Sequence, residues 1–184
     1  METCVEDANR TIFNAASANP QYAGMGTTLV MAVFQGERVL IGHLGDSRCY
    51  RLRGSSLLQI THDHSLLQEQ IDAGLLAPEQ AQYASHKNLV TRALGVQDAV
   101  LLEVKEWRVE DGDLYLLCSD GLNDMLPEHR IAAILAQSHT LEKKAHSLID
   151  AAKRNGGRDN ISVILTHARG KPAQRGLLSR MLGQ

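Results

Sequence analysis

Two stretches decide how this chain folds: LIGHLGDSR at residues 40–48 and LYLLCSDG at residues 114–121. In each stretch an apolar run as long as a buried strand leads through a small residue to an aspartate, Asp46 or Asp120. A third aspartate, Asp159, precedes a further apolar run. Carboxylates at strand ends can converge into an oxygen-rich site for Mg²⁺ or Mn²⁺. Turn formation is the alternative, because aspartate beside glycine is common in turns.

Around these aspartates, runs of predicted strands alternate with helices. We expect a helix that begins near Val5 and ends at Asn19 and Pro20, since the residue before proline avoids helical dihedrals. A short helix is predicted within residues 63–74, capped by Asp63, and two more begin near Pro127 and Thr140. Strands are predicted at 27–34, 38–44, 47–53, 56–61, 100–109, 113–118 and 160–166. Their close spacing favours antiparallel hairpins, and the whole order predicts an α+β layered domain.

Composition narrows the classes of function. A chain of 184 residues with 43% hydrophobic residues can build one compact domain. A net charge of −2 offers no basic field for nucleic acid. The apolar runs are shorter than the roughly 20 residues of a membrane helix, so we expect no membrane partner. Cys4, Cys49 and Cys118 form neither a disulfide framework nor a zinc pattern, which favours a cytoplasmic location.

Several polar residues allow two interpretations. Arg48 could bind phosphate, but an ion pair that anchors its strand is the preferred interpretation. Asn160 could orient a neighbouring carboxylate or simply form a turn. His62 and His64 could suggest zinc, although a loop that leads into a helix is preferred. His43, on an apolar strand, is expected to be a core histidine with its hydrogen bonds satisfied.

Six short motifs carry a family resemblance. In chain order they are GMGTT at 24–28, GDSRCY at 45–50, THDHS at 61–65, TRALG at 91–95, LCSDGL at 117–122 and GRDN at 157–160. Together they resemble the bacterial branch of the protein phosphatase 2C family, the metal-dependent PPM-type serine/threonine phosphatases. The resemblance extends from the first predicted helix to His167, which is most of the chain.

The resemblance implies an αββα sandwich of two antiparallel sheets flanked by helices. It implies hydrolysis of phosphoserine and phosphothreonine in proteins by a metal-activated water, with two to three Mn²⁺ or Mg²⁺ ions in the complete family site. By motif, Asp120 and Asp159 correspond to ligands of the first metal, and Asp46 together with Asp120 to ligands of the third. The residues expected beside these ligands or near the substrate are Asn160, Arg48, Ser119 and Gly121.

The same resemblance sets the expected organisation and partners. Residues 1–168 would form a partial PPM-type phosphatase domain, with residues 66–88 as its variable flap, and 169–184 a basic, flexible tail. The partners would be phosphorylated proteins that a serine/threonine kinase has modified, in a signalling role, and the protein would be a monomer.

Two family motifs are absent from the sequence. The family opens with strands that carry Arg-x-x-Asn-Glu-Asp and then Asp-Gly-x-Gly-Gly, and neither pattern occurs. The resemblance therefore implies the loss of an aspartate that bridges two metals and of a phosphate-binding arginine. The alternative function is accordingly a truncated, catalytically inactive phosphatase-like domain that acts as a binding module.

Three explanations fit the missing motifs: a start assigned too far downstream, a fragment, or a naturally shortened protein. We prefer a truncated description of an ordinary phosphatase. The reading frame upstream of Met1 is then expected to encode Asp-Gly-x-Gly-Gly within a few codons. Sequencing that region tests this expectation, and stop codons found there would contradict it.

Overall fold

The computed structural model describes residues 1–77, 80 and 89–169. Its helices are α1 (Glu2–Ala18), η1 (Pro20–Tyr22), α2 (Leu66–Asp72), α3 (Asp120–Asn123), α4 (Glu128–Leu135) and α5 (Leu141–Arg154). Its strands are β1 (Leu29–Gln35), β2 (Arg38–Leu44), β3 (Arg48–Arg53), β4 (Ser56–Gln59), β5 (Glu103–Arg108), β6 (Leu114–Cys118) and β7 (Val163–His167). None of the helices in the described ranges combines the length and apolar character that a membrane span requires.

The strands form two antiparallel sheets, one with the order β1-β2-β5 and one with the order β4-β3-β6-β7. Hairpins join β1 to β2 and β3 to β4, as the close spacing of the apolar runs predicts. Strands β2 and β3 follow one another in the chain but belong to different sheets. The short segment between Leu44 and Arg48 is therefore a crossing from one sheet to the other, and it contains Asp46.

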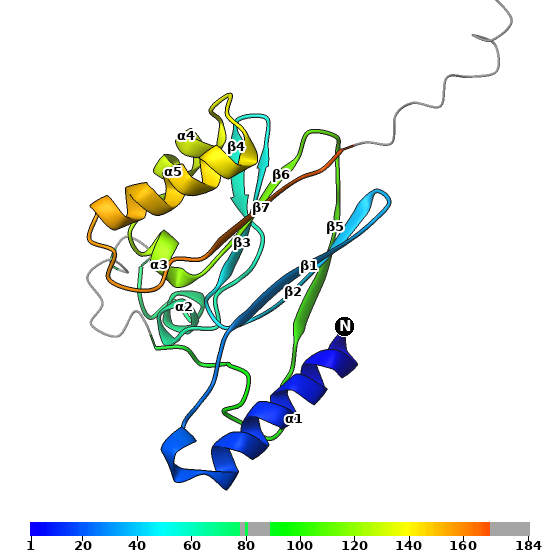
Figure 1. Ribbon diagram of the computed structural model, residues 1–184, viewed down its shortest axis with the longest axis vertical. Helices are drawn as coiled ribbons and strands as arrows, with labels where there is room; N and C mark the ends of the chain where they lie inside the picture. Colours follow the sequence, from blue (N-terminus) through cyan, green and yellow to red (C-terminus); the bar gives the residue numbers. More distant parts are fainter. Residues whose placement is uncertain (78–79, 81–88, 170–184) are drawn as a thin grey trace, which may run out of the picture.

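Three apolar clusters define four layers (Figure 1). The cluster between the sheets contains Ile41 of β2 and Tyr115 of β6. On the outer face of the three-stranded sheet, Val5 of α1 packs against Leu44. On the outer face of the four-stranded sheet, α3, α4 and α5 cover β6, with Leu148 fully buried. The predicted α+β class, with two antiparallel sheets flanked by helices, is confirmed.

One side of the sandwich carries a free edge of each sheet. Within the described residues, β1 pairs only with β2, and β7 pairs only with β6. The ring of Phe34 on β1 packs edge-on against Tyr115 on β6, with 5.2 Å between centroids, so the two free edges lie on the same side. Hydrophobic side chains remain partly accessible there, and Ile164 of β7 is 64% exposed. Free edges of this kind can accept further strands.

Most predicted elements are present, although η1 was not predicted and β5 begins at Glu103 rather than residue 100. Three further differences concern α3, the last strand and the cap of α2. The helix at 120–123 was not predicted, because four residues give no helical period. The last strand begins at Val163 rather than residue 160. Asp63 does not cap α2, since the Ser65 hydroxyl accepts the hydrogen bond from the backbone N–H of Gln68. The expected cap at Thr140 is confirmed by its bond from Lys143. Part of the expected flap and nearly all of the expected tail lie outside the described residues.

Leu148 offers a test of the packing of α5 on the four-stranded sheet. The change Leu148→Ala is expected to lower the free energy of unfolding by about 2–5 kcal/mol, because it leaves a cavity in a core that is fully closed at this point. Urea unfolding followed by circular dichroism measures the change. The matched control is Leu101→Ala, at a side chain that is 77% exposed, where about 0.5 kcal/mol or less is expected. Equal losses in both variants would contradict the burial.

Candidate metal centre

Asp46 lies on the crossing between the two sheets, and its position depends on Gly45. The φ angle of Gly45 is +96°, in the left-handed region that side chains rarely adopt. A Cβ at Gly45 would lie 2.4 Å from Cγ2 of Thr28, so no side chain fits there. The hydroxyl of Thr28 is also 2.8 Å from that of Ser47. The chain can therefore turn sharply here and leave Asp46, 9% exposed, facing the ends of β6 and β4.

Asp120 and Asp159 meet because two backbones approach closely at Gly121. A Cβ at Gly121 would lie 2.3 Å from the carbonyl oxygen of Asn160, so only glycine permits this approach. The hydroxyl of Ser119 donates to the same carbonyl at 3.0 Å and accepts from the N–H of Ser162 at 3.0 Å. Ser119 and Gly121 thus hold the segment that carries Asp159 against the first turn of α3.

The three predicted carboxylates form one electrostatic cluster. Burial and, next, the charge of Asp120 together raise the pKa of Asp46 to about 6. The pKa of Asp120 is also raised, first by burial and then by the charges of Asp159 and Asp124. Carboxylates that repel one another in this way are stabilised when one of them binds a proton or when they share a cation.

A cavity of about 160 Å³ lies at this cluster. Its acidic lining includes Asp46, Asp63, Asp120 and Asp124. Hard oxygen donors around a small cavity fit a divalent cation such as Mn²⁺ or Mg²⁺. Asp124 was missed by the sequence analysis, although its spacing of four residues from Asp120 would place both carboxylates on one face of a helix. Asp159 adds its charge at Asp120 but does not line the cavity.

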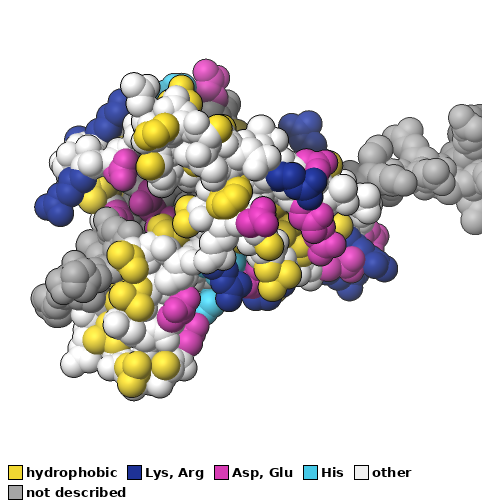
Figure 2. Space-filling view, turned by 90° about the horizontal axis from the view of Figure 1, so that it is seen from below, with side chains coloured by type: hydrophobic (Ala, Val, Ile, Leu, Met, Phe, Trp, Pro, Cys, Tyr) yellow, Lys and Arg dark blue, Asp and Glu magenta, His cyan; other side chains and the backbone are white. Residues whose placement is uncertain are grey.

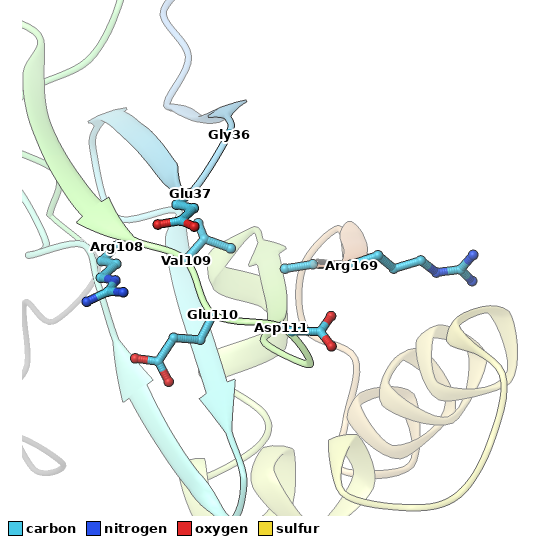
Figure 3. Close-up of a pocket in the computed structure, with 8 residues that line it drawn as sticks. Gly36, Glu37, Arg108, Val109, Glu110, Asp111 and Arg169 are labelled. Atoms are coloured by element: carbon cyan, nitrogen blue, oxygen red, sulfur yellow. The ribbon is translucent and has the colours of Figure 1, made fainter. Parts of the chain in front are cut away.

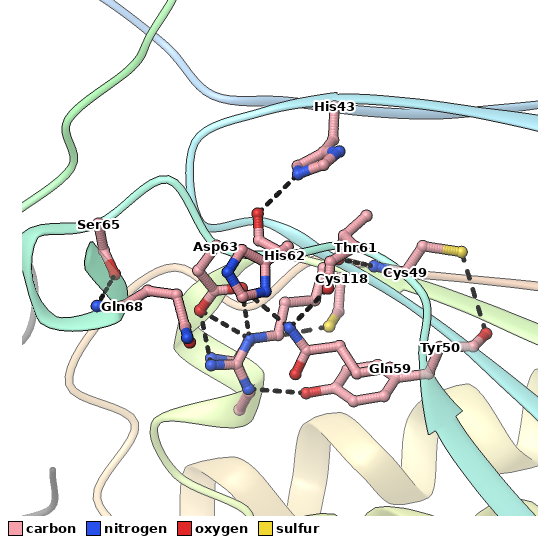
Figure 4. A network of polar contacts seen from close by, with 12 residues as sticks. His43, Cys49, Tyr50, Gln59, Thr61, His62, Asp63, Ser65, Gln68 and Cys118 are labelled. Carbon is pink, nitrogen blue, oxygen red and sulfur yellow. Dashed lines mark hydrogen bonds and ion pairs between the residues drawn. The ribbon is translucent and has the colours of Figure 1, made fainter. Parts of the chain in front are cut away.

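Arg48 is held beside this cavity by an ion pair with Asp63. Its Nη2 lies 2.6 Å from Oδ2 of Asp63, and its Nε donates to both carboxylate oxygens. Arg48 also donates to the hydroxyl of Tyr50, and Gln59 donates to Asp63 (Figure 4). The preferred interpretation of Arg48 as a strand anchor is confirmed. Asp63 is consequently neutralised within the lining.

The loop at residues 62–65 packs against the crossing. His43 donates from Nε2 to the carbonyl of His62 at 2.8 Å, so the expected core histidine with satisfied hydrogen bonds is confirmed (Figure 4). The imidazole of His62 points elsewhere and pairs with Asp72 at 2.7 Å. The backbone N–H of Gly45 donates to Nδ1 of His64 at 3.2 Å. Together with the ion pair of Asp63 and Arg48, these bonds tie the loop to the chain on both sides of Asp46.

Two further cavities lack the convergent groups of this site. One of about 470 Å³, at the opposite end of β6, has Glu110, Asp111 and Arg169 in its lining (Figure 3). Figure 3 shows its charged side chains pointing in different directions. The other, of about 560 Å³, is formed by the segment from Thr91 to Leu101. On the face in Figure 2, acidic and basic side chains are interspersed.

Known proteins resemble the chain over nearly its whole length. A family model described as protein phosphatase 2C matches residues 1–154. The serine/threonine phosphatase stp of Listeria innocua is 38% identical over 165 residues, which are 90% of this chain and 66% of that protein. The chain thus spans slightly less than two thirds of that relative.

Solved structures agree with this result. The crystal structure of a bacterial serine phosphatase has a TM-score of 0.88 and 32% identity, over 93% of this chain and 69% of that one. The catalytic domain of the phosphatase PstP, solved in complex with two manganese ions, has a TM-score of 0.83 and 36% identity, over 91% and 70%.

The electrostatic interaction between Asp46 and Asp120 predicts how the pKa of Asp46 responds to a mutation of Asp120. In the metal-free protein the Asp46 carboxyl is expected to titrate near pH 6, and Asp120→Asn should lower its pKa without restoring 3.8, since burial remains the largest cause. Carbon-detected NMR of the carboxyl groups against pH measures both values. The control is Asp7→Asn on α1, which should leave Asp46 unchanged.

The raised pKa of Asp46 also predicts how the stability of the folded protein depends on pH. Because the folded pKa of Asp46 lies above the unfolded value of 3.8, its proton stabilises the folded state fully below pH 3.8. That contribution is lost as pH rises through about 6. Asp46→Asn should remove this loss, and an Asp46 pKa near 3.8 in the parent protein would contradict the cluster.

Proposed function

The chain belongs to the protein phosphatase 2C family, and from this we propose that the protein hydrolyses phosphoserine and phosphothreonine in other proteins with the help of bound Mn²⁺ or Mg²⁺. The family model covers most of the chain, and the relatives that match it are named as serine/threonine phosphatases. Because the chain spans 66% of the length of the Listeria relative, the activity of the whole protein belongs to this proposal.

One observation of the structure carries the proposal: Asp46 and Asp120 face one small acidic cavity, where the charge of Asp120 acts on Asp46 and the charge of Asp159 acts on Asp120. These residues come from a sheet crossing, the end of β6 and the start of the segment that leads to β7. A purely structural role would not require Asp46 and Asp120 to face one another where burial raises the pKa of both. The related PstP domain was solved with two manganese ions.

Each residue then has a proposed role. Asp120 and Asp159 would hold one cation, and Asp46 and Asp120 another. Ser119 and Gly121 would keep the two strand-end segments in contact, and Asn160 would orient the neighbouring carboxylate through its backbone N–H, which donates to Oδ1 of Asp159 at 2.6 Å.

The proposed chemistry divides between cation and protein. A bound divalent cation supplies a water of lowered pKa and neutralises the phosphoryl oxygens. The carboxylates must be ionised to hold the cation, so protons compete with it below about pH 6 at Asp46. The fixed backbone around Gly45 and Gly121 keeps the carboxylates in place before the cation arrives, which reduces the reorganisation that binding requires.

Further parts of the proposal concern the setting. We propose that the substrates are proteins that a serine/threonine kinase has phosphorylated, and that the enzyme acts in signalling as a cytoplasmic monomer. The protein substrates follow from the named relatives. The cytoplasmic location is supported by the free thiols of Cys49 and Cys118, which are buried in the two apolar clusters that flank the four-stranded sheet.

Turnover of p-nitrophenyl phosphate with Mn²⁺ tests the proposed activity. Asp120→Asn should reduce turnover to the background rate, because Asp120 is shared by both proposed cation positions. Asp7→Asn, an exposed carboxylate on α1, is the matched control and should retain the parent rate. Calorimetric titration with Mn²⁺ should show binding in the parent and control and weakened binding in Asp120→Asn.

The combination of both measurements separates the alternatives. Mn²⁺ binding without turnover in the parent chain would favour the non-catalytic binding module. Turnover that survives Asp120→Asn unchanged would contradict the proposed site.

A further inference from the structure

His64 is firmly held within the loop at residues 62–65. It is 5% exposed, and four hydrogen bonds fix it. Its backbone N–H donates to the carbonyl of Gly45 at 3.0 Å, and its carbonyl accepts from the N–H of Thr91 at 2.9 Å. Its ring accepts the N–H of Gly45 at Nδ1, 3.2 Å away, and Nε2 lies 3.1 Å from Oε2 of Glu103. Gly45 is thus gripped through both its N–H and its carbonyl.

These contacts define the protonation of the ring. A backbone N–H can only donate, so Nδ1 of His64 must present its lone pair to Gly45. The ring proton is therefore on Nε2, where it donates to the carboxylate of Glu103. That carboxylate is ionised: burial would raise its pKa, but hydrogen bonds from Lys105 and His64 outweigh burial and lower the pKa to about 2. Glu103 and Gly45 together select one neutral tautomer of His64.

A metal at this histidine is the obvious alternative. One ligand atom each from His43, His64 and Glu103 lie within 4.8 Å of one another, and the two rings stack with centroids 4.6 Å apart. Binding through Nε2 of His64 would move its proton to Nδ1, directly opposite the N–H of Gly45. Binding through Nδ1 would displace that N–H and leave it buried without an acceptor. The hydrogen-bond directions therefore argue against a cation here.

We propose that His64 is a positioning residue for the metal ligand Asp46, and that it acts by accepting the Gly45 N–H at Nδ1 while Glu103 holds its Nε2–H. This inference rests on the proposed function, since it takes Asp46 as a ligand. Gly45 precedes Asp46 directly, and the path runs from Glu103 on β5 through the ring to the crossing between the sheets. Partners of this kind typically change metal affinity by about 10- to 100-fold when they are removed.

Two substitutions of His64 test the contributions of its two ring nitrogens separately. In His64→Asn, the carbonyl Oδ1 can occupy the position of Nδ1 and keep the bond to Gly45, while the contact with Glu103 is lost. In His64→Gln, the side chain can still reach Glu103 but has no acceptor at the Nδ1 position. The matched control is His62→Gln, the same change two residues away in the same loop, at a ring that pairs with Asp72 instead.

Two measurements on the full chain are compared: hydrogen exchange of the Gly45 amide without metal, and Mn²⁺ affinity by calorimetry. For His64→Gln we expect faster exchange at Gly45 and an affinity weakened by about 10-fold or more. His64→Asn and His62→Gln should remain near the parent in both. In addition, nitrogen NMR of the parent should show His64 as the Nε2–H tautomer.

Each contrary result has a distinct meaning. A proton on Nδ1 of His64, parent-like behaviour of His64→Gln, or faster exchange in that variant without weaker Mn²⁺ binding would each overturn the inference. If His64→Gln does not fold, a folded His64→Asn that loses Mn²⁺ affinity would overturn it as well. A parent chain that binds no Mn²⁺ would instead defeat the proposed function, while exchange at Gly45 would still decide whether His64 holds the crossing.

Discussion

The structure depends on how the chain is held where it passes from one sheet to the other. Such a crossing lacks the regular hydrogen bonding of a strand, yet here it is buried, so its polar groups need specific partners. The loop at residues 62–65 provides them, through His64 to Gly45 on one side of Asp46 and through Asp63 to Arg48 on the other. These contacts tie the chain on both sides of the Asp46 carboxylate to one loop.

The acidic cluster illustrates a balance between stability and function. Burial and neighbouring charges raise the pKa values of Asp46 and Asp120, so the folded protein without a cation carries an electrostatic strain at neutral pH. Asp63 avoids this strain because Arg48 neutralises it with a bidentate contact. Within the lining of the cavity, the charge of Asp63 is thus balanced by Arg48, whereas the charges of Asp46 and Asp120 remain available for a cation from solution.

Local patterns were sufficient for most of the fold. Apolar runs predicted every strand within a few residues, and Thr140 marked the start of α5 because capping depends only on neighbouring residues. Interactions between distant segments could not be predicted in this way. Asp63 was expected to cap a helix, but the side chain of Arg48, fifteen positions away, binds it instead. The last strand begins late because Ser119 holds the Asn160 carbonyl.

In the candidate site, too, features that depend on local sequence could be predicted, and features that depend on distant contacts could not. The order of the motifs predicted Asp46, Asp120 and Asp159, and the fold places Asp46 and Asp120 at one cavity, with the charge of Asp159 acting on Asp120. The roles of Gly121 and His64 became visible only in the three-dimensional structure, because a close backbone approach and a histidine tautomer leave no local pattern in the sequence. Asp124 lies between these cases, since its helical spacing from Asp120 was visible but the four-residue helix was not predicted.

The edges of β1 and β7 that are free within the described residues have a physical consequence. Unpaired backbone groups on one side of both sheets, next to a largely exposed Ile164, permit recruitment of another polypeptide by main-chain hydrogen bonding with little demand on its sequence. Self-association through these edges would grow with protein concentration and would be largely indifferent to divalent ions.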